Sequence, residues 1–189
     1  MKKSILITGV SGAGKSSLNI KLNETGYTSY DMEEIPGLFS MLDRRTGKPF
    51  TDYDHADLAK VTSLDWVCDT EKLDALIKNE TSPLAFYCGN ASDMETILPF
   101  FDSVVLLKIG PEATRHRLTT RTSNEFGRTS HIQDWIMTWK DQWDEEMEKK
   151  GAVVIDAHQS LDQIAKEVVE KVAGADTLAN EAMDRGSNI

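Results

Sequence analysis

The residues with the clearest chemical potential form one run near the N-terminus that fits G-x-x-x-x-G-K-S: Gly9-Val10-Ser11-Gly12-Ala13-Gly14-Lys15-Ser16. Glycines at these positions let consecutive backbone N–H groups turn into one hollow that binds phosphate oxygens. The helix predicted to start here directs the positive end of its dipole at the same anion. Lys15 supplies a mobile charge for the terminal phosphates, and the Ser16 hydroxyl can ligate Mg²⁺. The run therefore predicts a site for ATP and Mg²⁺.

A second group of chemically active residues is the arginine-rich segment at 115–130. Arg117 and Arg121 share one face of the helix predicted to begin at Pro111, and Arg128 follows after a polar turn. Guanidinium groups that close over a moving phosphoryl group stabilise its charge, so we predict that this segment is a lid. Like charges this close repel each other, and we expect exposed arginines in a mobile lid when no ligand is bound. The alternative is a solvated helix that pairs with acidic neighbours.

A run of carboxylates follows the second apolar segment of the chain. Asp31 comes directly after the predicted strand 27–30. Ligands bind beyond the carboxyl ends of strands in parallel α/β sheets, so Asp31 is a candidate catalytic residue. Glu33 and Glu34 are alternatives for the same role. The simpler interpretation is that Asp31 only caps the turn that follows it.

The elements that must position these residues alternate along the chain. Short apolar runs predict strands, and amphipathic stretches with caps or terminal glycines predict helices. The predicted strands are 4–8, 27–30, 83–88, 103–109 and 152–155. The predicted helices are 14–22, 70–79, 92–98, one that begins at residue 111, 130–150 and 160–172. Alternation of this kind requires crossover connections, so we predict a three-layer α/β/α P-loop NTPase fold with a five-stranded parallel sheet.

The same pattern of elements indicates the domain organisation. We predict a single domain at residues 1–172 and a polar C-terminal tail at residues 173–189. Residues 35–69 are punctuated by proline and glycine and rich in aspartate, so we expect loops and short helices there. This insert would shape the acceptor side of the site.

Composition excludes several classes of function. The chain has 189 residues, 40% of them hydrophobic, which is enough for one core. Its 21 Lys and Arg against 31 Asp and Glu give a net charge of −10, which disfavours binding to nucleic acid or to an anionic membrane. The apolar runs are too short to span a membrane, and the first one breaks at Gly9, too early for a signal peptide. We expect a soluble cytoplasmic protein in which Cys68 and Cys88 are unreactive core thiols.

Two further patterns have a structural interpretation and a functional one. Trp135, Trp139 and Trp143 are spaced four apart, and we interpret them as a core-facing stripe on a helix rather than as a base-stacking surface. The aspartates and histidine at 52–57 resemble a metal cluster, but they lack a fixed ligand spacing. We expect a solvated or acceptor-side loop there.

Together these motifs resemble the nucleoside and nucleotide kinases, with the adenylate-kinase and shikimate-kinase branches nearest. A closer resemblance is to a group of small bacterial kinase-like ATP-binding proteins, and it covers residues 1 to about 172. The stretches that carry it are Tyr30-Asp31 with Ile35-Pro36-Gly37-Leu38, Phe86-Tyr87-Cys88-Gly89, Arg121-Thr122-Ser123-Asn124-Glu125-Phe126-Gly127 and Ile155-Asp156-Ala157. The chain departs from adenylate kinases at strand three, where Cys88-Gly89-Asn90 replaces their Asp-Gly-x-Pro-Arg.

The resemblance implies a role for each matching residue. It implies that the phosphates and Mg²⁺ are held by Gly9, Ser11, Gly12, Ala13, Gly14, Lys15, Ser16 and Ser17. It implies that the lid arginines are Arg117, Arg121 and Arg128, and that the adenine lies beside Asp156, Ala157, His158 and Gln159. Asp31 would bind or deprotonate the acceptor, with Glu33, Gly89 and Asn90 on the same side.

We therefore expect a Mg-ATP-dependent phosphotransferase that acts on a small acceptor, with a nucleoside or a nucleotide first. The chain carries no Asn-Lys-x-Asp run for guanine and no strand that ends in an acidic pair, which disfavours a GTPase or a motor ATPase. Two alternatives stay open. One is a nucleotide-binding regulatory ATPase module, and the other is a kinase for a non-nucleotide acceptor of the shikimate or antibiotic type.

Overall fold

A five-stranded parallel sheet forms the centre of the protein, as predicted. The computed structural model describes residues 2–122 and 124–186. The strand order is β2-β5-β1-β6-β7, and every neighbouring pair is parallel. The strands are β1 (Lys3–Thr8), β2 (Thr28–Asp31), β5 (Leu84–Cys88), β6 (Ser103–Lys108) and β7 (Val153–Asp156). Because β1 is central, the phosphate-binding run that follows it begins in the middle of the sheet.

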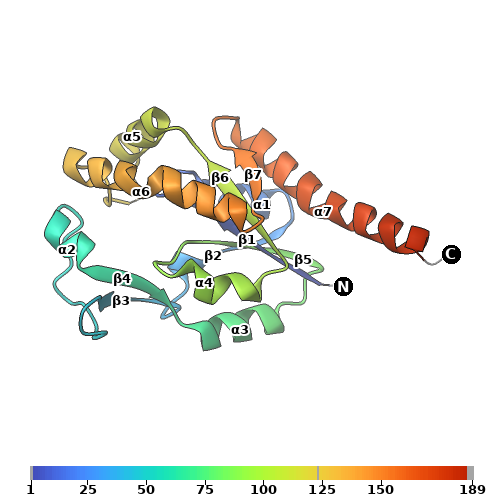
Figure 1. Ribbon diagram of the computed structural model, residues 1–189, viewed down its shortest axis with the longest axis horizontal. Coiled ribbons are helices and arrows are strands. Elements are labelled where there is room, and N and C mark those ends of the chain that lie inside the picture. Colours follow the sequence, from blue (N-terminus) through green and yellow to red (C-terminus); the bar gives the residue numbers. More distant parts are fainter. Residues whose placement is uncertain (1, 123, 187–189) are drawn as a thin grey trace.

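Helices cover both faces of this sheet and give the predicted three layers (Figure 1). Side chains alternate across β1, so Ile5 and Ile7 enter one core and Leu6 enters the other. The first core is completed by α1 (Lys15–Glu24) and α7 (Leu161–Gly186). The second core receives side chains from α3 (Thr70–Asn79), α4 (Met94–Ile97), the 3₁₀ turn η2 (Leu98–Phe100) and α6 (Ser130–Lys149).

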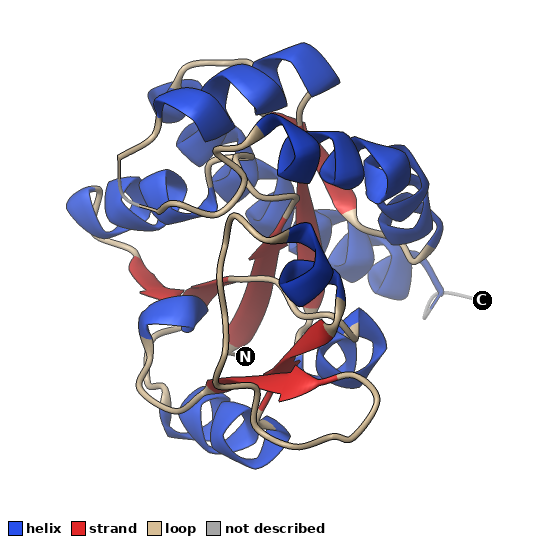
Figure 2. Cartoon of the chain, turned by 90° about the vertical axis from the view of Figure 1, so that its left-hand side faces the viewer, coloured by secondary structure: helices blue, strands red, loops and turns tan. Residues whose placement is uncertain are grey.

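The insert at 35–69 differs from the prediction of loops and short helices. It contains an antiparallel pair of strands, β3 (Phe39–Asp43) and β4 (Leu64–Cys68), and the helix α2 (Leu58–Thr62) between them (Figure 2). The rings of Phe39 and Trp66 stack across the pair, with centroids 5.1 Å apart and an interplanar angle of 4°. Most side chains of both strands are only partly buried, so the sequence lacks the clear alternation that marks a half-buried strand.

Helix ends also differ in places from the sequence interpretation. The last helix continues to Gly186 instead of ending at residue 172, because the alanines and leucine after Gly174 favour helix and one glycine does not end it. Asp69, rather than Thr70, caps α3 and accepts a hydrogen bond from the backbone N–H of Lys72. The helix predicted at 92–98 is the single turn α4 followed by η2. The remaining elements are η1 (Met32–Glu34) and α5 (Pro111–Thr120).

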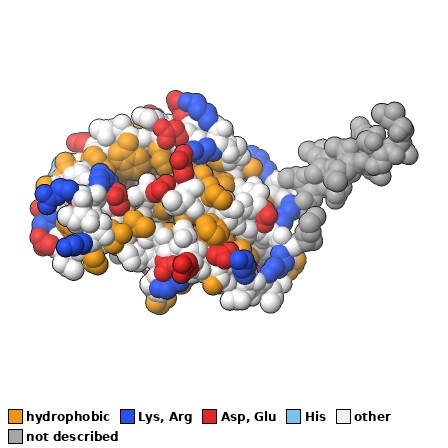
Figure 3. Space-filling view, turned by 60° about the horizontal axis from the view of Figure 1, so that its bottom comes forward, with side chains coloured by type: hydrophobic (Ala, Val, Ile, Leu, Met, Phe, Trp, Pro, Cys, Tyr) orange, Lys and Arg blue, Asp and Glu red, His pale blue; other side chains and the backbone are white. Residues whose placement is uncertain are grey.

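The two cysteines are buried, as expected. Burial raises the pKa of Cys68 to about 11 and that of Cys88 to about 12, so both thiols stay protonated at neutral pH. On the face drawn in Figure 3, acidic and basic side chains are interspersed among hydrophobic ones. Within the described part of the chain, no helix combines the length and the apolar character that crossing a membrane requires.

Candidate functional site

The phosphate-binding loop leaves the end of β1 in a conformation that needs glycine. A Cβ atom at Gly9 would lie 2.8 Å from the carbonyl oxygen of Leu107 and 2.9 Å from the Cβ of Ala13. Gly14 has a φ of +109° and precedes α1 without a side-chain cap. The amides of the first turn of α1 therefore have no acceptor within the helix, and an anion can take that place.

Lys15 lies over this loop with its ammonium directed back at the backbone. The Nζ atom donates a hydrogen bond of 2.8 Å to the carbonyl oxygen of Gly9. Burial lowers the pKa of Lys15 below its ordinary value, and the negative charges of Glu33 and, more weakly, Asp31 oppose that shift. The ammonium is thus a desolvated charge that gains stabilisation when phosphate oxygens arrive.

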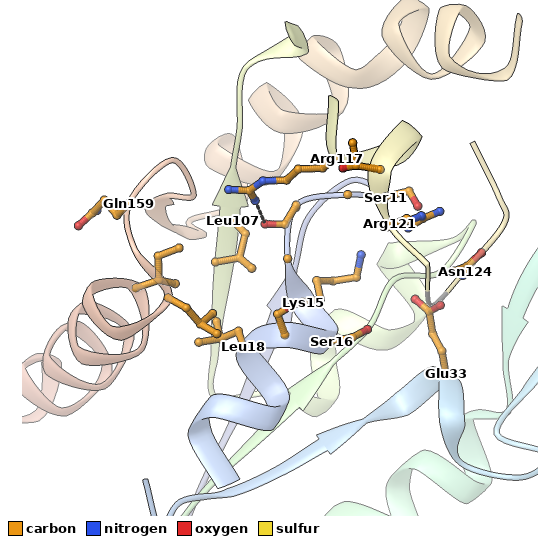
Figure 4. Close-up of a pocket in the computed structure, with 17 residues that line it drawn as sticks. Ser11, Lys15, Ser16, Leu18, Glu33, Leu107, Arg117, Arg121, Asn124 and Gln159 are labelled. Atoms are coloured by element: carbon orange, nitrogen blue, oxygen red, sulfur yellow. Dashed lines mark hydrogen bonds between the residues drawn. The ribbon is translucent and has the colours of Figure 1, made fainter. Parts of the chain in front are cut away.

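A cavity of about 450 Å³ opens over the loop (Figure 4). Figure 4 shows Lys15, Arg121 and Glu33 around its right-hand end and Gln159 at its left-hand end. The loop and the start of α1 form its floor. Its lining is completed by Glu33, Leu107, Arg117, Thr120, Arg121, Asn124, Gln159, Leu161 and Ile164.

Arg117 and Arg121 reach this cavity but are not the exposed arginines of an open lid that we expected. Arg117 donates hydrogen bonds to the carbonyl oxygens of Ala13, at 3.1 Å, and of Ala157, at 2.6 Å. Arg121 is partly buried and donates to the carbonyl oxygen of Phe126, and burial lowers its pKa. Its Nε atom is buried and has no hydrogen-bond partner in the described part of the chain. A phosphate oxygen would satisfy this donor.

The third predicted lid residue, Arg128, is placed elsewhere. Its guanidinium donates to the carbonyl oxygens of Arg121, at 3.1 Å, and Thr122, at 3.4 Å, and it lies 3.4 Å from a carboxylate oxygen of Glu125. It does not line the cavity over the phosphate loop. In this conformation Arg128 shapes the loop after α5, as the ion-pair interpretation expected.

The carboxylates after β2 have two different places in the structure: Asp31 caps a turn, and Glu33 lines the cavity. The Oδ1 atom of Asp31 accepts a hydrogen bond of 3.3 Å from the backbone N–H of Glu33, so Asp31 caps the 3₁₀ turn η1. Glu33 lines the cavity and acts on the Lys15 charge more strongly than Asp31 does. The geometry therefore favours Glu33 over Asp31 as the carboxylate beside the terminal phosphate, an alternative that the sequence left open.

The loop after β7 places one of the four residues predicted near the adenine against the cavity. Gln159 lines it, whereas the carbonyl of the buried Ala157 holds Arg117. His158 lies between two partners: its Nδ1 is 2.7 Å from Oδ1 of Asp156, and its Nε2 accepts a hydrogen bond of 3.2 Å from the backbone N–H of Gly110. His158 and Asp156 thus hold the turn.

A second cavity of about 600 Å³ adjoins the first on the side of the 35–69 insert. Ser11, Lys15, Glu33 and Asn124 line both cavities. The other lining residues come from η1, the insert, the loop after β5, the loop after α5, and α6: Glu34, Met41, Arg44, Tyr53, Val61, Leu64, Asp65, Trp66, Asn90, Ala91, Ser92, Phe126, Trp135, Trp139 and Trp143.

The sequence analysis did not place the tryptophans in this cavity, and it predicted that Gly89 would lie on the acceptor side of the site. Trp135, Trp139 and Trp143 pack against the core, as predicted, but each also lines the cavity. Their four-residue spacing could have indicated either role. Asn90 lines the cavity, whereas Gly89 does not, and a Cβ atom at Gly89 would lie 3.1 Å from the Cβ of Met32. Gly89 therefore allows η1 to approach the end of β5.

The donors beside the phosphate loop suit Mg²⁺. The Ser16 hydroxyl and the Glu33 carboxylate are oxygen ligands at the edge of an anion site, which is the chemistry that Mg²⁺ prefers. Across the described residues, no three His, Cys, Asp or Glu side chains come together as a metal cluster, including those at 52–57. A bound Mg²⁺ would therefore take most of its ligands from phosphate oxygens and water.

Comparison with solved structures gives the fold a context. The structure is similar to a deoxyadenosine kinase from M. mycoides, with a TM-score of 0.52, 17% identity, and coverage of 91% of this chain and 99% of that one. It is similar to a gluconokinase from Sinorhizobium meliloti 1021, with a TM-score of 0.52, 22% identity and coverage of 97% of both chains. It is also similar to the shikimate kinase from Aquifex aeolicus, with a TM-score of 0.53, 17% identity, and coverage of 92% and 98%.

Comparisons by sequence give no such relative. No protein-family model matches the chain. No curated protein matches it either. At identities of 17–22%, the likeness to the solved structures concerns the fold. The chain has the three-layer α/β fold of P-loop kinases, with the phosphate-binding loop after the central strand.

Proposed function

We propose that this protein is a Mg-ATP-dependent phosphotransferase that moves the γ-phosphoryl group of ATP to a small acceptor. One observation carries the proposal: the cavity over the phosphate loop and the second cavity meet at Lys15 and Glu33. Phosphoryl transfer needs a donor and an acceptor on opposite sides of the moving group, and two adjoining cavities provide that arrangement. A nucleoside or a nucleotide is the first expectation for the acceptor.

The residues divide the work of the reaction between them. The amides of the loop and of Ser16 and Ser17 bind the phosphates, with Gly9, Gly12 and Gly14 allowing the turn. Lys15, Arg117 and Arg121 stabilise the charge that develops on the moving group. When bound, Mg²⁺ would neutralise charge on the phosphate oxygens beside Ser16. Gln159 lies at the end of the cavity where the base of the nucleotide would bind.

The transfer step involves one bond formed and one bond broken. The acceptor hydroxyl oxygen forms a bond to the γ-phosphorus while the bond from that phosphorus to the bridging oxygen breaks, and ADP leaves. Glu33 accepts the hydroxyl proton. Asp31 holds η1, which positions Glu33. Gly89 allows the same turn to pack against β5, and Asn90 faces the acceptor. The proposal includes a cytoplasmic location, where ATP and Mg²⁺ are available.

The test is ADP production with a panel of acceptors that includes nucleosides, nucleoside monophosphates, shikimate and gluconate. At least one acceptor should raise ADP production well above the rate with Mg-ATP alone. Lys15→Ala should lower that rate at least a hundredfold, because it removes a charge that acts on the transition state, while the melting temperature is no lower than that of the wild type. Lys166→Ala, an exposed change on α7, is the matched control. Slow hydrolysis that no acceptor stimulates would support a regulatory ATPase module instead.

A further inference from the structure

The second cavity carries information about the acceptor itself. On the basis of the proposed function, we propose that the acceptor is a nucleoside without a phosphate group, with its base against the tryptophans of α6 and its hydroxyl directed at Glu33. This choice excludes two classes that the fold alone leaves open: nucleoside monophosphates and small carboxylic acids. It follows from the aromatic lining of the cavity and from its charges.

The aromatic lining is concentrated in this one cavity. The chain has four tryptophans, and all four line it: Trp66, Trp135, Trp139 and Trp143. Tyr53 and Phe126 add two further rings. Flat aromatic surfaces of this kind bind the π-face of a base by stacking, and they tolerate any base because every base has such a face. A sugar acid presents no flat ring to them.

Two contacts hold the rings in place. Trp66 on β4 stacks on Phe39 of β3, which fixes one wall of the cavity. On α6, the rings of Trp135 and Trp139 meet edge to face, with centroids 5.6 Å apart. The indole N–H of Trp139 is buried and has no acceptor in the described part of the chain.

The charges of the cavity disfavour an anion. Two cations line it among the described residues, and each has another partner. Lys15 is the residue that we assign to the phosphates of ATP, and its ammonium donates a hydrogen bond to the carbonyl oxygen of Gly9. Arg44 forms an ion pair with Asp65, with Nε and Oδ1 2.9 Å apart, and its Nη2 donates to the carbonyl oxygen of Leu64 at 3.1 Å.

Two glutamates of the same cavity add negative charge, of which only that of Glu33 lies close to the Lys15 and Arg121 cations. Glu33 and Glu34 both line it, and Glu34 has no ion pair or hydrogen bond among the described residues. A phosphate or carboxylate group on the acceptor would face these negative charges, and the guanidinium that lines the cavity, Arg44, is already paired with Asp65. The ribose hydroxyls of a nucleoside, in contrast, can donate hydrogen bonds to them. The cavity therefore fits a nucleoside and rejects its monophosphate.

The tryptophans make this inference directly measurable by intrinsic fluorescence. The first cavity has no tryptophan among its described lining residues, so ADP in that cavity should change the emission little. With ADP present at saturation, titration with nucleosides should change the emission in a saturable way. The matching 5′-monophosphates should bind at least tenfold more weakly, and gluconate and shikimate should give no response. A monophosphate or an acid that binds as tightly as every nucleoside overturns the proposal.

Variants at Trp139 and Asp65 test the two parts of the argument separately. Trp139→Leu should weaken nucleoside binding at least tenfold, and Trp139→Phe less, because phenylalanine keeps a stacking face. ADP affinity and thermal unfolding serve as folding controls. Asp65→Asn should release Arg44 and improve monophosphate binding severalfold relative to the nucleoside. The double variant Asp65→Asn, Arg44→Ala should lose that gain. If Asp65→Asn leaves the ratio of the two affinities unchanged, the charge argument is wrong.

The outcome also separates this inference from the proposed function. A nucleoside that binds at the tryptophans but never raises ADP production would contradict the transferase and leave the nucleoside site in place. ADP production driven by gluconate, shikimate or a monophosphate, with no nucleoside active, would keep the transferase and overturn the nucleoside acceptor.

Discussion

The guanidinium of Arg117 donates a hydrogen bond of 2.6 Å to the carbonyl oxygen of Ala157 and thereby joins α5 to the turn after β7. A second bond from the same side chain reaches Ala13 in the phosphate loop. The helix is thus tied to both sides of the cavity over the phosphate loop. A closing movement would then belong to the segment after Thr120 rather than to α5.

This relationship predicts that Arg117→Ala lowers stability as well as activity. Two hydrogen bonds from a charged group are lost, and we expect a cost of about 2 kcal/mol, or a decrease of about 4–8 °C in the melting temperature. Arg115→Ala on the same helix is the control. Arg115 makes an exposed ion pair with Asp134, so its loss should cost less than about 1 kcal/mol. Equal melting temperatures for the two variants would contradict the interpretation.

The two carboxylates after β2 should respond differently to neutralisation. Glu33→Gln removes the proton acceptor beside Lys15, and we expect a decrease of about a hundredfold or more in the transfer rate with little change in ATP affinity. Asp31→Asn keeps an oxygen that can cap η1 and should lower the rate less. Steady-state kinetics of the matched pair decide between them. A larger loss in Asp31→Asn would return the catalytic role to Asp31.

The desolvated Lys15 should change how the free energy of unfolding depends on pH. Its folded pKa lies below the ordinary value of 10.5, so the unfolded chain binds more protons between the two values. The free energy of unfolding of the ligand-free protein should therefore rise with pH in this window, relative to Lys15→Met. Urea unfolding of both proteins at several pH values up to 10.5 measures the difference. Parallel curves would show that the ammonium is not desolvated.

Glu80 should make folding sensitive to acid. Its carboxylate accepts hydrogen bonds from the Tyr30 hydroxyl and from the backbone N–H groups of Thr81 and Ser82, which lowers its pKa to about 2 from the ordinary 4.5. The resulting stability is fully present above 4.5 and is lost as pH falls toward 2. Unfolding at pH 6 should show wild type more stable than Glu80→Gln, and the gap should narrow at pH 3. A constant gap would contradict this pKa.

Much of the fold could be predicted because its local signals agree. The apolar runs around Ile5 and Val105 read as strands buried on both faces, and the proline at 111 and the glycine at 151 mark helix ends. The phosphate loop could also be predicted, because the geometry of anion binding fixes the positions of its glycines and of Lys15. In such segments the nearest neighbours in sequence decide the structure.

The rest depends on contacts that sequence spacing does not encode. The pair β3 and β4 joins residues about 25 positions apart through side chains such as Phe39 and Trp66, and neither strand alternates clearly. Whether Asp31 or Glu33 faces Lys15 depends on how η1 turns over Gly89. The double role of Trp139, in the core and in the cavity, depends on which element lies opposite α6.

The central place of β1 has a consequence for synthesis of the chain. β1 is synthesised long before its partners, which begin at Leu84 and Ser103. Until residue 88 has been made, its apolar side chains have no strand to pair with, and its second partner is complete only at residue 108. Parallel pairing over such separations is slow. The phosphate loop therefore takes shape late, and a nascent chain stalled before β5 would expose the apolar side chains of β1.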